Sequence, residues 1–379
     1  MEEKRTAAGA EEPAPKDKVR DLLRPETYPG RVAAVTSVET HMSFVFLAGD
    51  RAYKLKKAIR LPYLDFSTVD KREAICRKEL VLNRRLANGI YVDVVSLLAS
   101  DGKLGLEGRG RVVDWLVVMK RLDESLMLDA EILARRLDAE RIRPLEQLLA
   151  QFYRHARPIT VAPELYLARW RRQLRANRTA LLHPALGMPV PLVLRIDRAQ
   201  QRFLARCGDL LTGRLARRKI VDGHGDLRPE HIWLGRPVAV IDCLEFNDEF
   251  RTVDPFDEIA YLSVECERLG DAKLGPHITR TLTRMLSDEP ALELLAFYRC
   301  QRATLRAGLS IAHLLEDKPR TPAKWRPLAM QYLAIARREA LHLERVLSTR
   351  ADRRGARPRA VAGLLGQTTL QREERPASF

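Results

Sequence analysis

Eight consecutive residues, HGDLRPEH from His224 to His231, concentrate side chains that can do chemistry. A carboxylate can take a proton from a hydroxyl group, and carboxylates together with an imidazole can hold a divalent metal ion. The surrounding segment, residues 221–270, contains twelve acidic residues and four arginines, a formal charge of −8 in a chain of net charge +16. We therefore predict that this segment handles cations.

A further pair of carboxylates follows the octet. The apolar run Val238 to Ile241 predicts a short buried strand that ends in Asp242, 16 residues after Asp226. Glu245 lies three residues beyond Asp242. A carboxylate at the end of a buried strand is held in place, and oxygen ligands of this kind suit Mg²⁺.

The octet is similar to the catalytic loop of protein kinases, H-R-D-L-x-x-x-x-N, at its His, Asp and Leu positions. In such a loop the Asp accepts the proton of the attacking hydroxyl, and the Asn coordinates a magnesium ion that bridges phosphates. The resemblance implies a catalytic set and a metal-binding set: Asp226 as the base with His224 and Arg228, and Asp242, His231 and Glu245 as metal ligands.

The sequence departs from the kinase loop at His231, which stands where the Asn belongs. Imidazole suits Zn, Mn or Fe better than the hard Mg²⁺ ion. His231 is therefore an altered metal ligand, a core histidine or the mark of an inactive pseudokinase.

A kinase also needs a strand lysine for the phosphates and a helix glutamate that holds it. Lys54 in AYK follows that pattern, with Lys56 as the competing choice, and Glu79 is favoured over Glu73 as its partner. Lys56 and Lys57 are interpreted as solvated charges of an edge strand. The predicted nucleotide-binding set is Lys54, Glu79, Thr40, Ser43, Met119 and Arg121.

Over residues 32–347 the chain resembles the aminoglycoside phosphotransferase and choline kinase branch of the protein-kinase-like fold. HGDL, the ID strand and DPFDEIAY are similar to the motif series of that branch, and ETHMSFVFL, AYKLKK and IDCLEFN resemble an uncharacterised bacterial subgroup often fused to a P-loop ATPase. The P-loop motif G-x-x-x-x-G-K-[ST] is absent from this chain. The resemblance implies an ATP- and Mg²⁺-dependent phosphotransferase that acts on a small-molecule hydroxyl.

The elements that must position these residues predict an α+β, two-lobed fold. SFVFLAGDRAYKLKKA predicts a hairpin that turns at Gly49-Asp50, residues 69–86 predict a helix, and LGLEGRGRVV and DWLVVMKRL predict two more strands. We expect a disordered leader over 1–18, a small nucleotide-binding lobe with an antiparallel sheet and one helix over 19–123, a larger, mostly helical catalytic lobe over 124–348 and a basic, disordered tail over 349–379. Asp254 and Asp257 are expected to be structural, and Tyr298 and Arg299 to lie outside the site.

Composition limits the remaining possibilities. The chain of 379 residues has 46% apolar residues, no apolar run long enough for a membrane helix and no secretory signal, so we expect a cytoplasmic protein without a membrane partner. Its five scattered cysteines predict reduced thiols. The charge of +16 alone suggests a nucleic-acid partner, which is disfavoured because no nucleic-acid-binding motif is present. The rival to an active kinase is a nucleotide-binding pseudokinase that serves as a regulatory or scaffold module.

Overall fold

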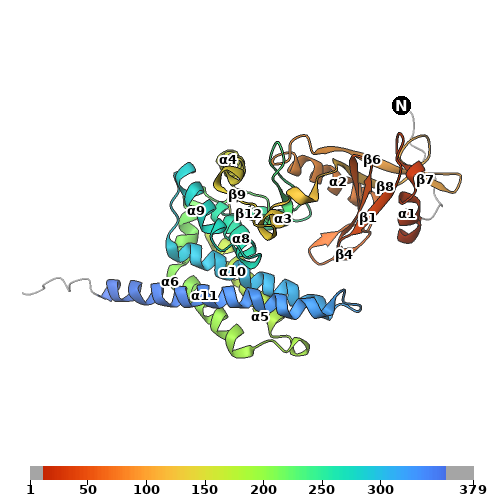
Figure 1. Cartoon of the computed structure of the whole chain (residues 1–379). Coiled ribbons are helices and arrows are strands. Elements are labelled where there is room, and N and C mark those ends of the chain that lie inside the picture. Colours follow the sequence, from red (N-terminus) through yellow and green to blue (C-terminus); the bar gives the residue numbers. More distant parts are fainter. Residues whose placement is uncertain (1–11, 356–379) are drawn as a thin grey trace, which may run out of the picture.

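The computed structural model describes residues 12–355 and has two parts, a small lobe built on a sheet and a larger helical lobe (Figure 1). The sheet of the first part, here called the N-lobe, is antiparallel throughout, with strand order β1-β2-β3-β8-β6-β7. Its strands are β1 (Val35–Glu39), β2 (Ser43–Ala48), β3 (Arg51–Lys56), β6 (Tyr91–Ser100), β7 (Lys103–Gly105) and β8 (Arg111–Lys120). A separate two-stranded ribbon consists of β4 (Arg60–Leu61) and β5 (Leu64–Asp65).

Both faces of the sheet are covered. Helix α2 (Val69–Asn83) is capped by Thr68, whose side chain accepts a hydrogen bond from the Lys71 N–H. The helix packs through Cys76 on the face of the sheet that leads to the catalytic elements. The opposite face buries Phe46 and Leu116 together with Leu22 of the N-terminal segment. The sheet is therefore a rigid support for β3, the strand that contains Lys54.

The structure confirms the predicted hairpin and helix and differs elsewhere in the N-lobe. The segment predicted as two strands, residues 104–122, forms the end of β7, a loop and the single strand β8. Strand β6 was not predicted. Helix α1 (Pro15–Leu22) occupies part of the predicted disordered leader, because Lys18 and Leu22 are buried there against the sheet. The rest of the leader, residues 1–11, lies outside the described residues.

The helical part, here called the C-lobe, begins after β8. Its longer helices are α3 (Leu128–Leu133), α4 (Ala139–His155), α5 (Pro163–Leu181), α6 (Val190–Ala216), α8 (Pro255–Arg268), α9 (Leu274–Met285), α10 (Leu292–Ala312) and α11 (Pro322–Gly355). One continuous apolar core joins these helices, and α11 runs along α10 and α6 (Figure 1). Helix α11 continues through the first residues of the predicted tail, and residues 356–379 lie outside the described residues.

A small insert of short elements interrupts the helices and holds the octet. Strand β9 (Val221–Asp222) precedes the octet and pairs with β12 (Thr252–Val253), while β10 (Ile232–Trp233) follows it and pairs with β11 (Ala239–Val240). The octet is thus anchored at both ends, and the strand before Asp242 lies beside the strand after His231.

The shorter helices are η1 (Pro25–Thr27), η2 (Glu124–Leu126), η3 (Pro184–Leu186), η4 (Pro229–His231), α7 (Asp248–Arg251) and η5 (His313–Leu315).

Two expectations from composition can be compared with the structure. All five cysteines are buried and none forms a disulfide. Among residues 12–355, no helix has the length and apolar character needed to cross a membrane.

Candidate active site

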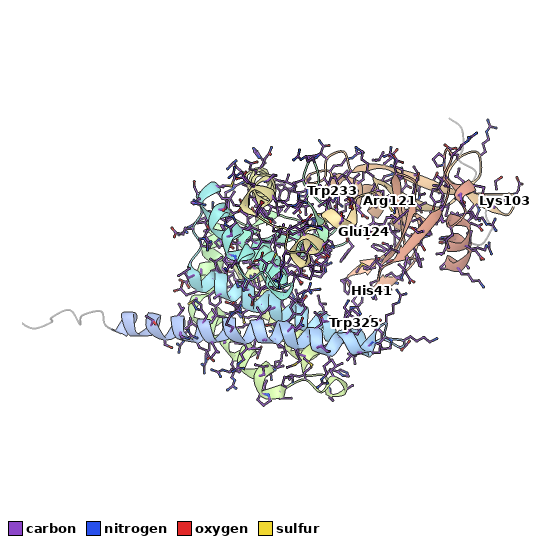
Figure 2. The ribbon with its side chains drawn as sticks, in the orientation of Figure 1. His41, Lys103, Arg121, Glu124, Trp233 and Trp325 are labelled. Atoms are coloured by element: carbon purple, nitrogen blue, oxygen red, sulfur yellow. The ribbon has the colours of Figure 1, made fainter. Side chains whose placement is uncertain are left out.

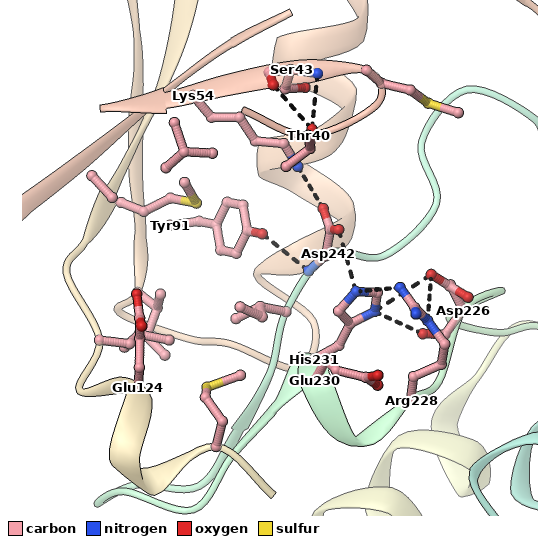
Figure 3. A pocket seen from close by; sticks show the side chains of 18 of the residues that line it. Thr40, Ser43, Lys54, Tyr91, Glu124, Asp226, Arg228, Glu230, His231 and Asp242 are labelled. Atoms are coloured by element: carbon pink, nitrogen blue, oxygen red, sulfur yellow. Dashed lines mark hydrogen bonds and ion pairs between the residues drawn. The ribbon is translucent and has the colours of Figure 1, made fainter. Parts of the chain in front are cut away.

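A cavity of about 860 Å³ lies between the two lobes and brings together most of the predicted site residues (Figure 3). The N-lobe side comprises the β1–β2 turn, strand β3 and the end of β8, and the C-lobe side comprises the octet and the segment after β11. The predicted residues that line the cavity are Thr40, Ser43, Lys54, Met119, Arg121, Asp226, Arg228, His231, Asp242 and Glu245. Glu79, which pairs with Lys54, and His224 are fully buried and do not line the cavity.

The octet holds Asp226 through buried backbone contacts. Gly225 has a φ of +89°, a conformation that glycine adopts without strain. The Glu258 carboxylate accepts hydrogen bonds from the backbone N–H groups of His224 (3.1 Å) and Gly225, and from the Tyr153 hydroxyl at 2.8 Å. A buried carboxylate on helix α8 therefore fixes the turn that presents Asp226 to the cavity.

The ring of His224 is fully buried and acts as a structural link. Its Nε2 donates to the Ile241 carbonyl at 2.9 Å, and its Nδ1 accepts the Asp226 N–H at 3.3 Å. This pattern requires a neutral imidazole, and burial, followed by the nearby His231, lowers the pKa of His224 to about 4. His224 thus joins the octet to the strand that ends at Asp242.

Arg228 and His231 surround the Asp226 carboxylate (Figure 3). Arg228 Nε donates to Asp226 Oδ2 at 3.1 Å. Burial would favour the protonated acid, but Arg228 and His231 hold the pKa of Asp226 below its ordinary value. Asp226 is therefore an ionised carboxylate at neutral pH.

Both ring nitrogens of His231 have partners within the protein. Nδ1 lies 2.9 Å from the Asp226 carbonyl oxygen, which can only accept, so we assign the proton to Nδ1. Nε2 then accepts from Arg228 Nη2 at 3.0 Å and lies 3.5 Å from Asp242 Oδ2. A metal ion could bind His231 only if Arg228 moved away, so its role as a metal ligand stays a prediction.

Asp242 sits in the left-handed region, with a φ of +61°, which is uncommon for a residue other than glycine. Its N–H donates to the Tyr91 hydroxyl at 3.1 Å, and the next N–H, of Cys243, donates to Asn83 Oδ1 at 2.9 Å. These contacts from the N-lobe stabilise a conformation that costs free energy locally. The carboxylate consequently points into the cavity, where its side chain is 43% exposed.

Lys54 lies between the carboxylates of the two lobes. Its Nζ donates to Asp242 Oδ1 at 2.5 Å and to Glu79 Oε1 at 2.8 Å. Burial alone would favour the neutral amine, but Asp242 and Glu79 raise the pKa of Lys54 well above its ordinary value. The same lysine, after the opposing effect of burial, holds the pKa of Asp242 well below its ordinary value. The competing partner Glu73 pairs instead with Arg77 on the same helix.

Lys56 and Lys57 differ from their prediction as solvated edge-strand charges. Strand β3 lies inside the sheet between β2 and β8 and is not an edge strand. Lys56 is buried and contacts Glu79 and Glu245. Lys57 follows β3 and donates to Glu39 Oε1 at 2.6 Å and to the Thr40 carbonyl at 2.7 Å.

The β1–β2 turn and the end of β8 form the opposite wall. The Thr40 hydroxyl accepts the Ser43 N–H at 3.0 Å and donates to the Ser43 carbonyl at 3.0 Å, so it stabilises the turn itself, and Ser43 is buried. Met119 and Arg121 line the cavity, and the Arg121 N–H donates to the Asp50 carbonyl at 2.8 Å. Their roles in nucleotide binding stay predictions.

Asp254 and Asp257 occupy the expected structural positions. Asp254 caps helix α8 by accepting the Phe256 N–H at 2.9 Å and pairs with Arg214. Asp257 pairs with Arg302 at 2.6 Å.

Three residues that hold the site were not predicted from the sequence: Glu258, Tyr91 and Asn83. Each is a single polar residue in an otherwise ordinary helix or strand, and each acts on a backbone far away in the sequence. The only local signal was the position of Glu258 in the DPFDE segment, where an acid also suits the first turn of a helix.

The donors in the cavity suit a magnesium ion that also binds phosphate. Among residues 12–355, no group of three or more His, Cys, Asp or Glu side chains is arranged to hold a metal ion alone. Mg²⁺ is usually held by one or two carboxylates together with phosphate oxygens and water. Asp242 offers such a carboxylate, whereas Glu245 is directed to Lys56.

Comparisons with known proteins identify relatives by sequence but no family model that matches. Uncharacterized proteins of Mycobacterium tuberculosis and Mycobacterium bovis are each 30% identical over 347 residues, 89% of this chain. The chain spans 66% of the length of these relatives.

Solved structures share the architecture at low sequence identity. A choline kinase from Cryptosporidium parvum has a TM-score of 0.50 and 8% identity, over 88% of this chain and 97% of that chain. A choline/ethanolamine kinase family protein from Mesorhizobium loti has a TM-score of 0.43 and 15% identity, over 85% of this chain and 99% of that chain. The small antiparallel N-lobe, the helical C-lobe and the match to the first of these agree: the chain has the two-lobed protein-kinase-like fold found in choline kinases.

Proposed function

We propose that the protein is an ATP-dependent phosphotransferase that acts on a hydroxyl group of a small molecule. One observation carries the proposal: Lys54, joined to Glu79 and Asp242, faces the same cavity as the ionised Asp226. The fold shared with a choline kinase supports the same class of reaction.

The proposed division of labour follows from the geometry. Lys54 and the backbone of the β1–β2 turn bind the phosphates, and Asp242 holds the magnesium ion. Mg²⁺, when bound, supplies neutralisation of the charge on the phosphate oxygens. Asp226 orients the acceptor hydroxyl and takes its proton as the hydroxyl oxygen attacks the terminal phosphorus, while the bond from that phosphorus to the bridging oxygen breaks and ADP leaves. Arg228, beside Asp226, stabilises the negative charge of the group in transfer.

Replacement of Asp226 tests this assignment. In Asp226→Asn we expect kcat to fall by at least about 100-fold, because the proton acceptor is lost, while the Kd of Mg-ATP changes little. Turnover is measured with a panel of hydroxyl metabolites, and binding is measured by calorimetry. Near-parental kcat in the variant would show that Asp226 is not the base.

The contact of Arg228 with both Asp226 and His231 favours one alternative, a nucleotide-binding pseudokinase. In a pseudokinase, Arg228 permanently occupies the side of the Asp226 carboxylate that an acceptor hydroxyl must approach. The pseudokinase predicts that the parental protein binds Mg-ATP but transfers phosphate to no acceptor of the panel.

A further inference from the structure

A second lysine lies in the site without a role in the proposed reaction. The Lys56 side chain is 2% exposed, whereas Lys54 is 12% exposed and Asp242 is 43% exposed. Lys56 Nζ also lies 5.6 Å from the centre of the Phe66 ring, which covers it from the N-lobe side. Lys56 also lines the cavity, but its ammonium is almost completely covered, so Lys54 is the more accessible lysine for a phosphate.

Glu79 divides its two oxygens between the lysines. Oε1 accepts from Lys54 at 2.8 Å, and Oε2 contacts Lys56. Glu79 is fully buried, so an oxygen that lost its lysine would be left without water. An unpaired charge at such a depth is strongly destabilising.

Glu245 connects this pair to the C-lobe. It follows Asp242 by three residues, is buried, and contacts Lys56 Nζ through Oε1. Lys56 therefore lies between a carboxylate of helix α2 and a carboxylate of the segment that presents Asp242.

The charges of the cluster show what Lys56 contributes. Glu79, Asp242 and Glu245 supply three negative charges, and the two lysines supply two positive charges. Without Lys56, three carboxylates would surround Lys54 alone. Lys54 would then be drawn towards several partners, and the Asp242 and Glu245 carboxylates would repel each other.

We propose that Lys56 is a positioning residue, which neutralises Glu245 and the second oxygen of Glu79 so that Lys54 stays on Asp242. The inference rests on the proposed function and assigns Lys56 no contact with the nucleotide. Lys56 acts by keeping the phosphate-binding Lys54 of the N-lobe paired with the metal-binding Asp242 of the C-lobe.

The test uses the full chain and compares Lys56→Met, Glu245→Gln and the double variant Lys56→Met/Glu245→Gln, with Lys71→Met as a control on the exposed face of α2. Calorimetry measures the Kd of Mg-ATP, and hydrogen exchange without nucleotide follows residues 241–247. In Lys56→Met we expect a rise in Kd of at least about tenfold and faster exchange, because the carboxylates lose their compensating charge. The double variant should recover most of the lost affinity, because one positive and one negative charge have been removed together, although Glu79 Oε2 still lacks its lysine. Lys71→Met should match the parent.

The outcomes separate this inference from the proposed function. The positioning role is overturned if Lys56→Met binds Mg-ATP as tightly as the parent. It is also overturned if Lys56→Met loses affinity and the double variant does not recover it, since that result means direct contact of Lys56 with the nucleotide. The pair Lys54→Met and Lys54→Met/Glu245→Gln serves as a reference, in which no recovery is expected. If the parent binds no Mg-ATP, the proposed function fails, and hydrogen exchange alone tests the positioning role of Lys56. Faster exchange of residues 241–247 in Lys56→Met, reversed in the double variant, supports that role. Unchanged exchange overturns it. If Lys56→Met does not fold, the double variant must fold and keep near-parental affinity, and its failure to do so overturns the role.

Discussion

At the scale of single residues, the site depends on side chains whose two polar ends have different partners. Asp242 Oδ1 accepts a hydrogen bond from Lys54, and Asp242 Oδ2 faces the cavity, 3.5 Å from His231 Nε2. His224 donates from one nitrogen and accepts with the other. Substitutions that keep the shape and change one end are therefore the informative ones.

Asp242→Asn tests the carboxylate without a change of size. We expect the variant to lose the increase in nucleotide affinity that Mg²⁺ gives the parent, because an amide oxygen is a weaker partner for the ion. Calorimetry with and without Mg²⁺ measures this difference. If Mg²⁺ still strengthens binding as much as in the parent, the ion is held elsewhere.

The buried His224 predicts how stability depends on pH. Its pKa is lowered to about 4 in the folded protein, against about 6.5 in an unfolded chain. Between these values the unfolded chain binds a proton that the folded protein does not, so stability is lost as pH falls from about 6.5 to about 4. The loss attributable to His224 is about 3 kcal/mol. Urea unfolding across this range should show a smaller fall in His224→Gln, although that variant is less stable at pH 7, and parallel curves would contradict the assignment.

The sequence was informative for residues that act near their own position in the chain. His224, Asp226 and His231 lie within one octet, so their proximity follows from local structure. The prediction for Lys56 is wrong because its burial depends on contacts with Glu79 and with Glu245, which lies 189 residues away in the sequence and cannot be placed beside β3 from local pattern. The contact of Glu258 with the octet depends in the same way on tertiary packing.

At the scale of elements, helix α2 is anchored far from the cavity by a buried ionic cluster. Arg72 on α2 donates to Asp114 Oδ1 at 2.7 Å and to the Phe66 carbonyl at 2.9 Å. Lys18 on α1 reaches the other oxygen of Asp114 at 2.6 Å. Asp114 thus joins α1, α2 and β8, and it fixes the helix that holds Glu79.

Asp114→Asn should therefore destabilise the whole N-lobe. Lys18 and Arg72 would keep only the part-exposed Glu12 carboxylate as a charged partner, and breaking a buried ion pair costs about 3–5 kcal/mol. Urea unfolding measures the change, with the exposed Glu140→Ala as the control that should stay within about 0.5 kcal/mol of the parent. A loss below about 1 kcal/mol in Asp114→Asn would mean that the cluster contributes little to stability.

Elements were predictable where apolar periodicity and turn chemistry agree. The β2–β3 hairpin met both conditions, whereas α2 was marked chiefly by the Thr68 cap at its start. Strand β6 did not, because its sequence YVDVVSLLAS has no strict alternation and the strand contains irregular register. The glycines near residue 108 belong to a loop between β7 and β8 and not to a strand.

At the scale of the whole molecule, the two lobes also meet at the mouth of the cleft. Arg320, before α11, pairs with Glu39 at the end of β1 at 2.6 Å. The His41 ring contacts the His313 ring edge-on at a centroid distance of 6.3 Å, and the His313 ring stacks on Trp325 at a centroid distance of 4.0 Å. Figure 2 shows His41 of the N-lobe opposite Trp325 of the C-lobe. The β1–β2 turn is therefore connected to the C-lobe.

Loss of the Arg320 contact should ease the opening of the cleft. In Arg320→Ala we expect release of a fluorescent nucleotide to be up to about fivefold faster at low salt, because an exposed ion pair contributes at most about 1 kcal/mol. The difference should shrink at high salt, where exposed charges are screened. Stopped-flow release at two ionic strengths measures both effects, with the nearby exposed Lys318→Ala as the control. Equal release rates at low salt would exclude this contact as a constraint on opening.

The left-handed backbone at Asp242 limits which amino acids could ever replace it. Asn and Gly tolerate this conformation, whereas Val, Ile and Thr place a branched Cβ against the backbone and would strain it. Natural variation at this position should therefore be confined to Asp, Asn and Gly, even in descendants that have given up catalysis. Within this set Asp alone keeps the negative charge, so the residue found at this position in a related gene would separate lineages that retain metal binding from lineages that retain only the fold.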